Sequence, residues 1–279
     1  MVINIKKIII IILILLIIIL FKLLQESFTN INYKDDYLNG IDIIYWINLD
    51  RSVNRRNDIE EMFQDKSFYN IPNKRIPAID GKTEYLDSIL KSYFHNFKYE
   101  IDNKEYGCIL SHLLAILEFN NSNYEIGLII EDDMTIKYKQ YWKEPIKTCI
   151  KNAPDDWEII QLTYLTYNNY IPSDIYTRSN GGSGTGAYII SKKGANKLIN
   201  LLYYNNKFDL NNKGYAVADY LLYSQLISYK YKYPYFIPAN KDSEIHPDHI
   251  DSLHIPATNT LEIILQEVIN FSNNIISSI

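Results

Sequence analysis

Apolar residues along the chain form two patterns, short continuous runs and longer stretches with helical spacing. The continuous runs are typical of strands buried on both faces of a sheet. They predict strands at residues 41–47, 127–130, 157–162 and 186–190, with shorter strands at 75–79 and 233–237. Helical spacing predicts helices at residues 53–63, 105–119, 191–202, 217–227 and 260–271. This alternation indicates an α/β fold with a mainly parallel sheet flanked by helices.

The N-terminal part of the chain is more continuously apolar than the rest. Residues 8–21 are uninterrupted Ile, Leu and Phe, and the apolar stretch continues through Leu24. A helix of about 17 residues spans roughly 25 Å and can cross a thin bilayer. Lys6 and Lys7 precede it, which favours a cytosolic N-terminus. We predict a cytosolic tip and uncleaved transmembrane signal anchor at 1–27, a short stem at 28–39 and one domain at 40–279; a cleaved signal peptide is the alternative.

That topology is single-pass type II, with the folded domain on the lumenal or extracytoplasmic side. The net charge of −5 and the lack of a basic stripe argue against nucleic acid as a ligand. Cys108 and Cys149 are too few for a disulfide framework and too far apart for a metal knuckle. We interpret them as buried thiols, with a single disulfide in an oxidising lumen as the alternative.

Three consecutive acids, Glu131, Asp132 and Asp133, directly follow the predicted strand at 127–130. In an open α/β sheet, ligands bind in the crevice beyond the carboxyl ends of the strands. Crowded carboxylates repel one another, which raises a pKa or recruits a cation. A hard divalent ion, Mn²⁺ or Mg²⁺, suits such oxygen ligands. The alternative is a solvated acidic turn with no chemical role.

Several sequence blocks occur together with this acidic run. They are Tyr45-Trp46-Ile47-Asn48-Leu49-Asp50-Arg51 with Asn54-Arg55-Arg56, Ala78-Ile79-Asp80-Gly81, Gly107-Cys108-Ile109-Leu110-Ser111-His112, Ile129-Ile130-Glu131-Asp132-Asp133, Pro154-Asp155-Asp156-Trp157 and Gly186-Ala187-Tyr188-Ile189-Ile190-Ser191. In this order the blocks resemble glycosyltransferase family 25, which includes lipooligosaccharide galactosyltransferases and procollagen galactosyltransferase domains. The resemblance extends from Ile43 to about Ile245. It departs near Ile116, where the family often has an aromatic residue, and is loose beyond Tyr229.

The resemblance implies a GT-A-type, Rossmann-like fold and an inverting, metal-dependent transfer from a nucleotide sugar, a UDP-sugar by expectation. We assign Asp133 to the metal and Glu131 to either the metal or the ribose of the donor, with Asp132 as an alternate metal ligand. His246 is the first candidate to complete the metal shell, and a solvated loop histidine is the alternative. The expected donor-binding residues are Asn48, Leu49, Arg51, Arg55, Ser111, His112, Glu131, Asp132, Gly184 and Gly186. Inversion needs a carboxylate base for the acceptor hydroxyl, for which Asp219 is the first candidate and Asp209 the second. Plainer interpretations are a solvated helix face for the arginines, a structural role for His112 and a simple turn for the glycines.

The predicted function is therefore a glycosyltransferase that moves galactose or another hexose to a glycan or protein acceptor. The loose match of the late segment leaves both the sugar and the acceptor open. One alternative is a catalytically inactive, membrane-anchored homologue that binds glycans or nucleotide sugars. Another is a metal-dependent phosphohydrolase.

Overall fold

The computed structural model describes residues 36–96, 102–166, 170–181, 184–210, 217–239, 251 and 255–277, with side chains up to Val268 in the last range. The apolar run at 8–24, most of the predicted stem and His246 lie outside these residues. Within the described ranges, no helix is both long and apolar enough to cross a membrane.

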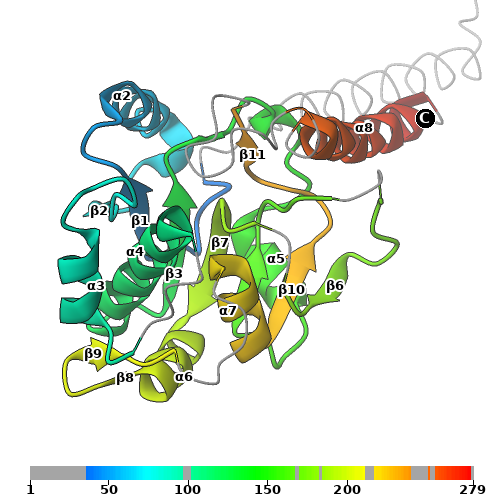
Figure 1. Ribbon diagram of the computed structural model, residues 1–279. Coiled ribbons are helices and arrows are strands. Elements are labelled where there is room, and N and C mark those ends of the chain that lie inside the picture. The colour runs from blue at the N-terminus through cyan, green and yellow to red at the C-terminus, as the bar shows by residue number, and fades with distance from the viewer. Residues whose placement is uncertain are drawn as a thin grey trace, which may run out of the picture.

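A seven-stranded sheet forms the centre of the structure (Figure 1). In spatial order its strands are β2 (Asn73–Pro77), β1 (Ile43–Asn48), β3 (Ile126–Glu131), β7 (Ala187–Ser191), β5 (Ile159–Gln161), β10 (Ser228–Tyr231) and β6 (Tyr176–Ser179). β1 pairs in parallel with β2 and β3, and β5 pairs in parallel with β10. β7 is antiparallel to β3 and β5, and β6 is antiparallel to β10. The remaining strands share one direction, which confirms an α/β fold with a mainly parallel sheet.

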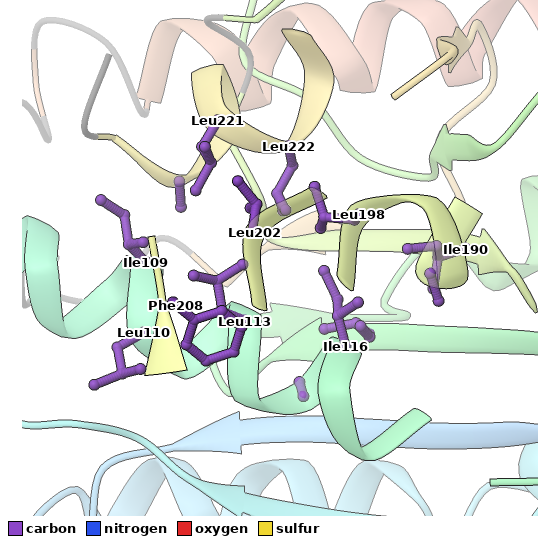
Figure 2. Packing of buried hydrophobic residues seen from close by; sticks show 14 of the residues in the cluster. Ile109, Leu110, Leu113, Ile116, Ile190, Leu198, Leu202, Phe208, Leu221 and Leu222 are labelled. Carbon is purple, nitrogen blue, oxygen red and sulfur yellow. The ribbon is translucent and has the colours of Figure 1, made fainter. Parts of the chain in front are cut away.

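The sheet is covered on both faces because side chains alternate along each strand. Tyr45 and Ile47 of β1 belong to the core on the face covered by α3 (Leu86–Tyr93), α4 (Asn103–Asn120), α6 (Lys192–Leu202) and α7 (Ala218–Gln225). Ile44 and Trp46 pack on the opposite face with α2 (Val53–Met62) and α5 (Ile146–Asn152). Figure 2 shows the first core, where apolar side chains of α4, α6 and α7 converge around Phe208.

Shorter elements complete the described fold. β4 (Met134–Thr135) pairs with β11 (Ile237–Pro238), and β8 (Tyr203–Tyr204) forms a hairpin with β9 (Lys207–Phe208). Two 3₁₀ helices lie at Lys66–Phe68 (η1) and Lys139–Tyr141 (η2). The C-terminal helix α8 (Ile255–Ser277) packs through Leu261 and Ile264 against Tyr164 and Ile237. It therefore belongs to the folded body.

Most predicted elements are present, but the late strand is in another place. The strand predicted at 233–237 is wrong, because the sheet strand is β10 and only Ile237 of that range belongs to a strand, β11. Ser228 and Tyr231, at the ends of β10, are fully buried between β5 and β6. The segment after β10 instead brings Tyr235 to Trp142, whose Nε1 donates to the Tyr235 carbonyl at 2.7 Å. The sequence patterns also gave no sign of α3, α5 or β6, which are short.

The two cysteines lie on opposite faces of the sheet. Cys108 is in α4 and Cys149 is in α5, and both are free thiols. Burial raises the pKa of the Cys149 thiol to about 12. Because the sheet separates the two sulfurs, a disulfide between them would need the core to rearrange.

Candidate active site

The acidic run begins where two neighbouring strands end together. In the parallel pair of β1 and β3, Ile47 lies opposite Glu131. The Asp132 amide then donates to the Ile47 carbonyl at 3.1 Å. This brings Asn48, which is 1% exposed, beside the acids, and its Nδ2 donates to Asp132 Oδ2 at 2.6 Å. The structure thus brings Asn48 and the acidic run together at the carboxyl edge of the sheet.

The Asn48 side chain is held in one orientation by two arginines. Its Oδ1 accepts hydrogen bonds from Nε of Arg56 and from Nε of Arg75, both at 3.0 Å. Arg75 Nη2 also donates to the Asn48 carbonyl at 2.9 Å. With the amide oxygen occupied by these donors, Nδ2 points to Asp132. The sequence analysis did not identify Arg75 as part of the site. The one indication was its position as the single charged residue of the predicted strand at 75–79.

Arg55 contacts the acids directly. Its Nη1 lies 3.1 Å from Asp132 Oδ1 and 3.5 Å from Asp133 Oδ2. Both oxygens of Asp132 therefore have a donor, one from Asn48 and one from Arg55. Burial still raises the pKa of Asp132, while Asn48 and Arg55 oppose that rise.

Asp133 is the least satisfied of the three acids. Its Oδ1 is buried and has no hydrogen-bond partner within the described part of the chain. Burial raises the pKa of Asp133 to about 7, with the charges of Glu131 and Asp132 adding to the rise and Arg55 opposing it. A buried carboxylate oxygen without a donor is costly, and a cation would remove the cost.

The described residues contain no group of three or more His, Cys, Asp or Glu placed to hold a metal ion. His246 lies outside them. Mg²⁺ in substrate complexes is usually held by only one or two carboxylates together with substrate phosphates and water. The unpartnered Oδ1 of Asp133 fits a site of that kind.

Glu131 lies on the opposite side of the strand end, in a closed hydrogen-bond network. Its Oε1 accepts from the Thr185 hydroxyl at 2.7 Å and lies 3.3 Å from His112 Nε2. Nδ1 of His112, a residue 1% exposed, is 3.0 Å from the Tyr188 hydroxyl. Burial by itself would raise the pKa of Glu131, but the hydrogen bond and charge of His112 and the Thr185 hydroxyl bring it below its usual value. The protein therefore supplies this carboxylate with its own partners.

The motif that contains Ser111 and His112 combines close packing with this network. A Cβ on Gly107 would lie 2.4 Å from the Ile79 carbonyl oxygen, so α4 needs a glycine there. Ser111 Oγ donates to the Gly107 carbonyl at 2.6 Å and accepts from the Ile79 amide at 2.9 Å. Ser111 thus joins α4 to the loop after β2, whereas His112 reaches the acidic run.

Gly184 and Gly186 flank Thr185 in the segment before β7. Gly184 has a φ of +75°, which favours glycine. A Cβ on Gly186 would lie 2.7 Å from the Met134 sulfur. The Gly184 amide donates to Asp219 Oδ2 at 2.9 Å, at the start of α7. The structure therefore connects Asp219 to Glu131 through two consecutive residues, Gly184 and Thr185.

Three further predicted residues lie away from this network. Arg51 Nε donates to Asp80 Oδ2 at 2.6 Å, and Leu49 beside it is half-buried. Asp209 follows β9, where its Oδ2 accepts from the Tyr204 hydroxyl at 3.2 Å. Figure 1 shows the β8–β9 hairpin at the opposite end of the sheet from the ends of β1 and β3. Of the two candidate bases, the structure brings only Asp219 to the acidic run.

A pocket of about 290 Å³ opens beside Asp132 and Asp133. Its walls come from α2, the β4 region, the β11 region and α8. They are formed by Asp58, Glu61, Met62, Asp132, Asp133, Met134, Thr135, Lys137, Ile237, Pro238, Ala239, Thr258 and Glu262. The acidic run thus faces a cavity, as a ligand site at a sheet edge requires.

Comparisons with known proteins relate the chain to glycosyltransferases. A protein from Aedes aegypti called "Glycosyltransferase 25 family member" is 27% identical over 175 residues, which cover 57% of this chain and 28% of that relative. This chain thus corresponds to less than a third of the relative's length. A solved structure, a "glycosyltransferase involved in the glycosylation of the major capsid of PBCV-1", aligns over 55% of this chain and 61% of its own, with 12% identity and a TM-score of 0.29. That score is too low to bear on the fold.

The family model described as "Glycosyltransferase family 25 (LPS biosynthesis protein)" matches residues 41–220. This range includes β1, α4, the acidic run, Gly184–Gly186 and Asp219, and it is well over half of the 279 residues. The chain therefore belongs to glycosyltransferase family 25.

Proposed function

We propose that the protein is a metal-dependent glycosyltransferase that moves a hexose from a nucleotide sugar, most simply a UDP-sugar, to a glycan or protein acceptor. The proposed arrangement is GT-A-type, with the donor at the carboxyl edge of β1 and β3. Family membership supports the transferase chemistry. The pocket beside the acidic run supports the location of the reaction.

One observation carries the proposal: Asp133 Oδ1 is buried at the pocket with no hydrogen-bond partner in the described part of the chain, while both oxygens of Asp132 have donors. Asp133 would hold a divalent cation, Mn²⁺ or Mg²⁺. When bound, such an ion neutralises the charge that develops on a departing diphosphate. Glu131 is proposed to orient donor or metal ligands from the other side, because its Oε1 is fixed by Thr185 and His112.

The remaining residues have proposed roles that follow from their contacts. Asn48 and Arg55 hold Asp132 still, which keeps the backbone of Asp133 in place. Asp219 is proposed as the base that takes the proton of the acceptor hydroxyl in an inverting displacement. Its Oδ1 and Oδ2 accept the Tyr220 and Gly184 amides at 2.7 and 2.9 Å, which fixes the orientation of the carboxylate.

We also propose that residues 8–24 anchor the protein as a type II membrane protein. The continuous apolar sequence and the preceding Lys6 and Lys7 support this topology. Protease protection in sealed vesicles tests it, because the folded domain should be protected on the lumenal side. Digestion of that domain without detergent would contradict the topology.

A donor panel tests the proposed chemistry on the full-length protein. Thermal unfolding and hydrolysis are measured with UDP-, GDP- and CMP-sugars, with Mn²⁺, with Mg²⁺ and with chelator. We expect one nucleotide class to stabilise the protein and to be hydrolysed slowly, only with metal. Stabilisation without turnover would indicate an inactive binding homologue, and phosphate release from many simple esters would indicate a phosphohydrolase.

A further inference from the structure

The pocket beside Asp133 is closed on one side by a helix outside the region that the family model matches. The match ends at residue 220, whereas Thr258 and Glu262 of α8 line the pocket. Across from them stand Asp58 and Glu61 of α2. One wall is therefore built by residues within the matched range and the other by residues beyond it.

The α8 wall is fixed in place by specific contacts. The Tyr138 hydroxyl donates to Glu262 Oε1 at 2.6 Å. Glu267, on the same helix, lies 3.0 Å from Lys232 Nζ, but it is exposed and does not line the pocket. Leu261, fully buried, packs the same helix against Tyr164 and Ile237. Glu262 is thus held at the pocket before any ligand arrives, which lowers the entropy lost on binding.

The chemistry of the lining restricts the ligand. Five side chains are carboxylic acids and one, Lys137, is an ammonium. Carboxylates accept hydrogen bonds, so they suit a ligand with many donors and repel an anion. Apolar side chains of Met62, Met134 and Ile237 lie among them. A sugar ring is complementary to this lining. The hydroxyl groups around its edge can donate to the carboxylates, and the C–H groups on its faces can contact the apolar side chains.

The volume of the pocket also favours a sugar ring as the ligand. A volume of about 290 Å³ is at the lower end of the roughly 300–1,000 Å³ typical of small-molecule pockets. It accommodates a single ring better than an extended peptide. A diphosphate is anionic and would enter this lining only with its cation at Asp133, so the α8 side of the pocket is left for the other substrate.

We propose that the α8 side of this pocket binds an uncharged sugar ring of the acceptor other than the ring that reacts, because Asp219 does not line it. Glu262 accepts hydrogen bonds from the hydroxyls of this ring, and Tyr138 positions Glu262. The proposal rests on the proposed transferase function and names its acceptor class. Glu262 becomes a specificity-determining residue, because its charge selects against acidic sugars.

The test is saturation-transfer NMR on the full-length protein with Mg²⁺ and UDP. The probes are methyl β-galactoside and methyl β-glucoside (neutral), methyl β-glucuronide (anionic) and methyl β-glucosaminide (cationic). We expect the neutral glycosides to bind at least about tenfold more tightly than the glucuronide. In Glu262→Gln, neutral binding should weaken about fivefold, because a hydrogen bond to a charged group becomes one to a neutral group, and discrimination against the glucuronide should shrink.

Two further variants keep the test specific. Glu267→Gln is the matched control on the same helix, and it should bind all four probes like the wild type. Tyr138→Phe should shift the probe preferences in the direction of Glu262→Gln, though less far. Circular dichroism checks that each variant is folded.

Four results would overturn the proposal: no neutral glycoside binds, the glucuronide binds equally well, the glucosaminide binds best, or Glu262→Gln behaves like Glu267→Gln. Failure of the transferase function is a separate result, since it appears as no metal-dependent hydrolysis of any nucleotide sugar in the donor panel. Neutral-sugar binding that depends on Glu262 can be observed whatever that panel gives.

Discussion

The two sides of the acidic run are built differently, although each holds a half-buried carboxylate. On the inner side, Glu131 has partners in Thr185 and His112, and its pKa lies below the usual value despite burial. On the outer side, Asp133 Oδ1 has no hydrogen-bond partner among the described residues, and burial raises its pKa to about 7. The described residues supply Glu131 with two partners, whereas one oxygen of Asp133 has none among them. Position within a charged motif therefore says less about function than the list of donors around each oxygen.

The largest expected effect comes from removing the outer carboxylate. In Asp133→Asn, sugar transfer should fall at least about a hundredfold, the usual cost of losing one electrostatic group in an active site. Thermal stability should stay the same or rise, because the substitution removes a half-buried charge of which one oxygen lacks a donor among the described residues. Initial rates and unfolding curves measure both. The control is Asp87→Asn, which replaces an exposed acid paired with Lys91. If Asp133→Asn transfers sugar within threefold of the wild-type rate, the proposed metal role is contradicted.

Breaking the inner side should instead cost stability. In His112→Ala, the Glu131 carboxylate and the Tyr188 hydroxyl both lose a partner. We expect the free energy of unfolding to fall by about 2–3 kcal/mol, measured by urea denaturation. His95→Ala removes a less buried histidine that contacts Tyr204, so it should cost less. Equal losses in the two variants would show that the inner network is not a special source of stability.

The pH dependence of stability separates the two carboxylates further. For Asp133, the folded-state pKa of about 7 lies above the usual 3.8, so the folded state binds the proton more tightly. In metal-free protein, this group makes stability fall as pH rises from about 4 to about 7. Glu131 has the opposite sign, because its lowered pKa gives stability that is lost only as pH falls below its usual 4.5.

The direction of this pH dependence can be tested with the unfolding free energies of wild type and Asp133→Asn, measured from about pH 4 to about pH 7 without metal. The difference between the two proteins should grow in favour of the variant as pH rises to about 7. A difference that stays constant would show that Asp133 titrates like an exposed acid.

The smallest effect is expected at Ser111, which lies next to His112 but contacts only backbone in its two hydrogen bonds. Ser111→Ala should lower the free energy of unfolding by about 1 kcal/mol. A donor-binding role, as the resemblance implied, would appear instead as a raised KM for the nucleotide sugar. Paired measurements of unfolding and donor KM distinguish these results.

The sequence was sufficient for the long strands and helices but not for the short elements or for every strand direction. The strand at 127–130 and the helix at 105–119 were predicted from long, regular apolar patterns. The reversal of β7 could not be predicted, since an apolar run is the same in either direction. β10 was placed too late because its sequence, Ser-Tyr-Lys-Tyr, is as polar as a loop and becomes buried only through its neighbours.

The candidate site, like the fold, could be predicted from the sequence only in part. That the acids would face a crevice followed from one rule about strand ends in α/β sheets. Which acid had donors did not follow, because Arg55 and Asn48 reach Asp132 from 77 and 84 residues away in the chain. The pocket wall at Glu262 is more distant still and depends on how α8 docks. Such contacts are properties of the folded chain.

Titration calorimetry of Mn²⁺ into the full-length protein with UDP present tests the central claim most directly. The account predicts one Mn²⁺ bound per chain in the wild type, with affinity at least about tenfold lower in Asp133→Asn, since a charged ligand becomes a neutral one. Equal Mn²⁺ affinity in the two proteins would contradict it.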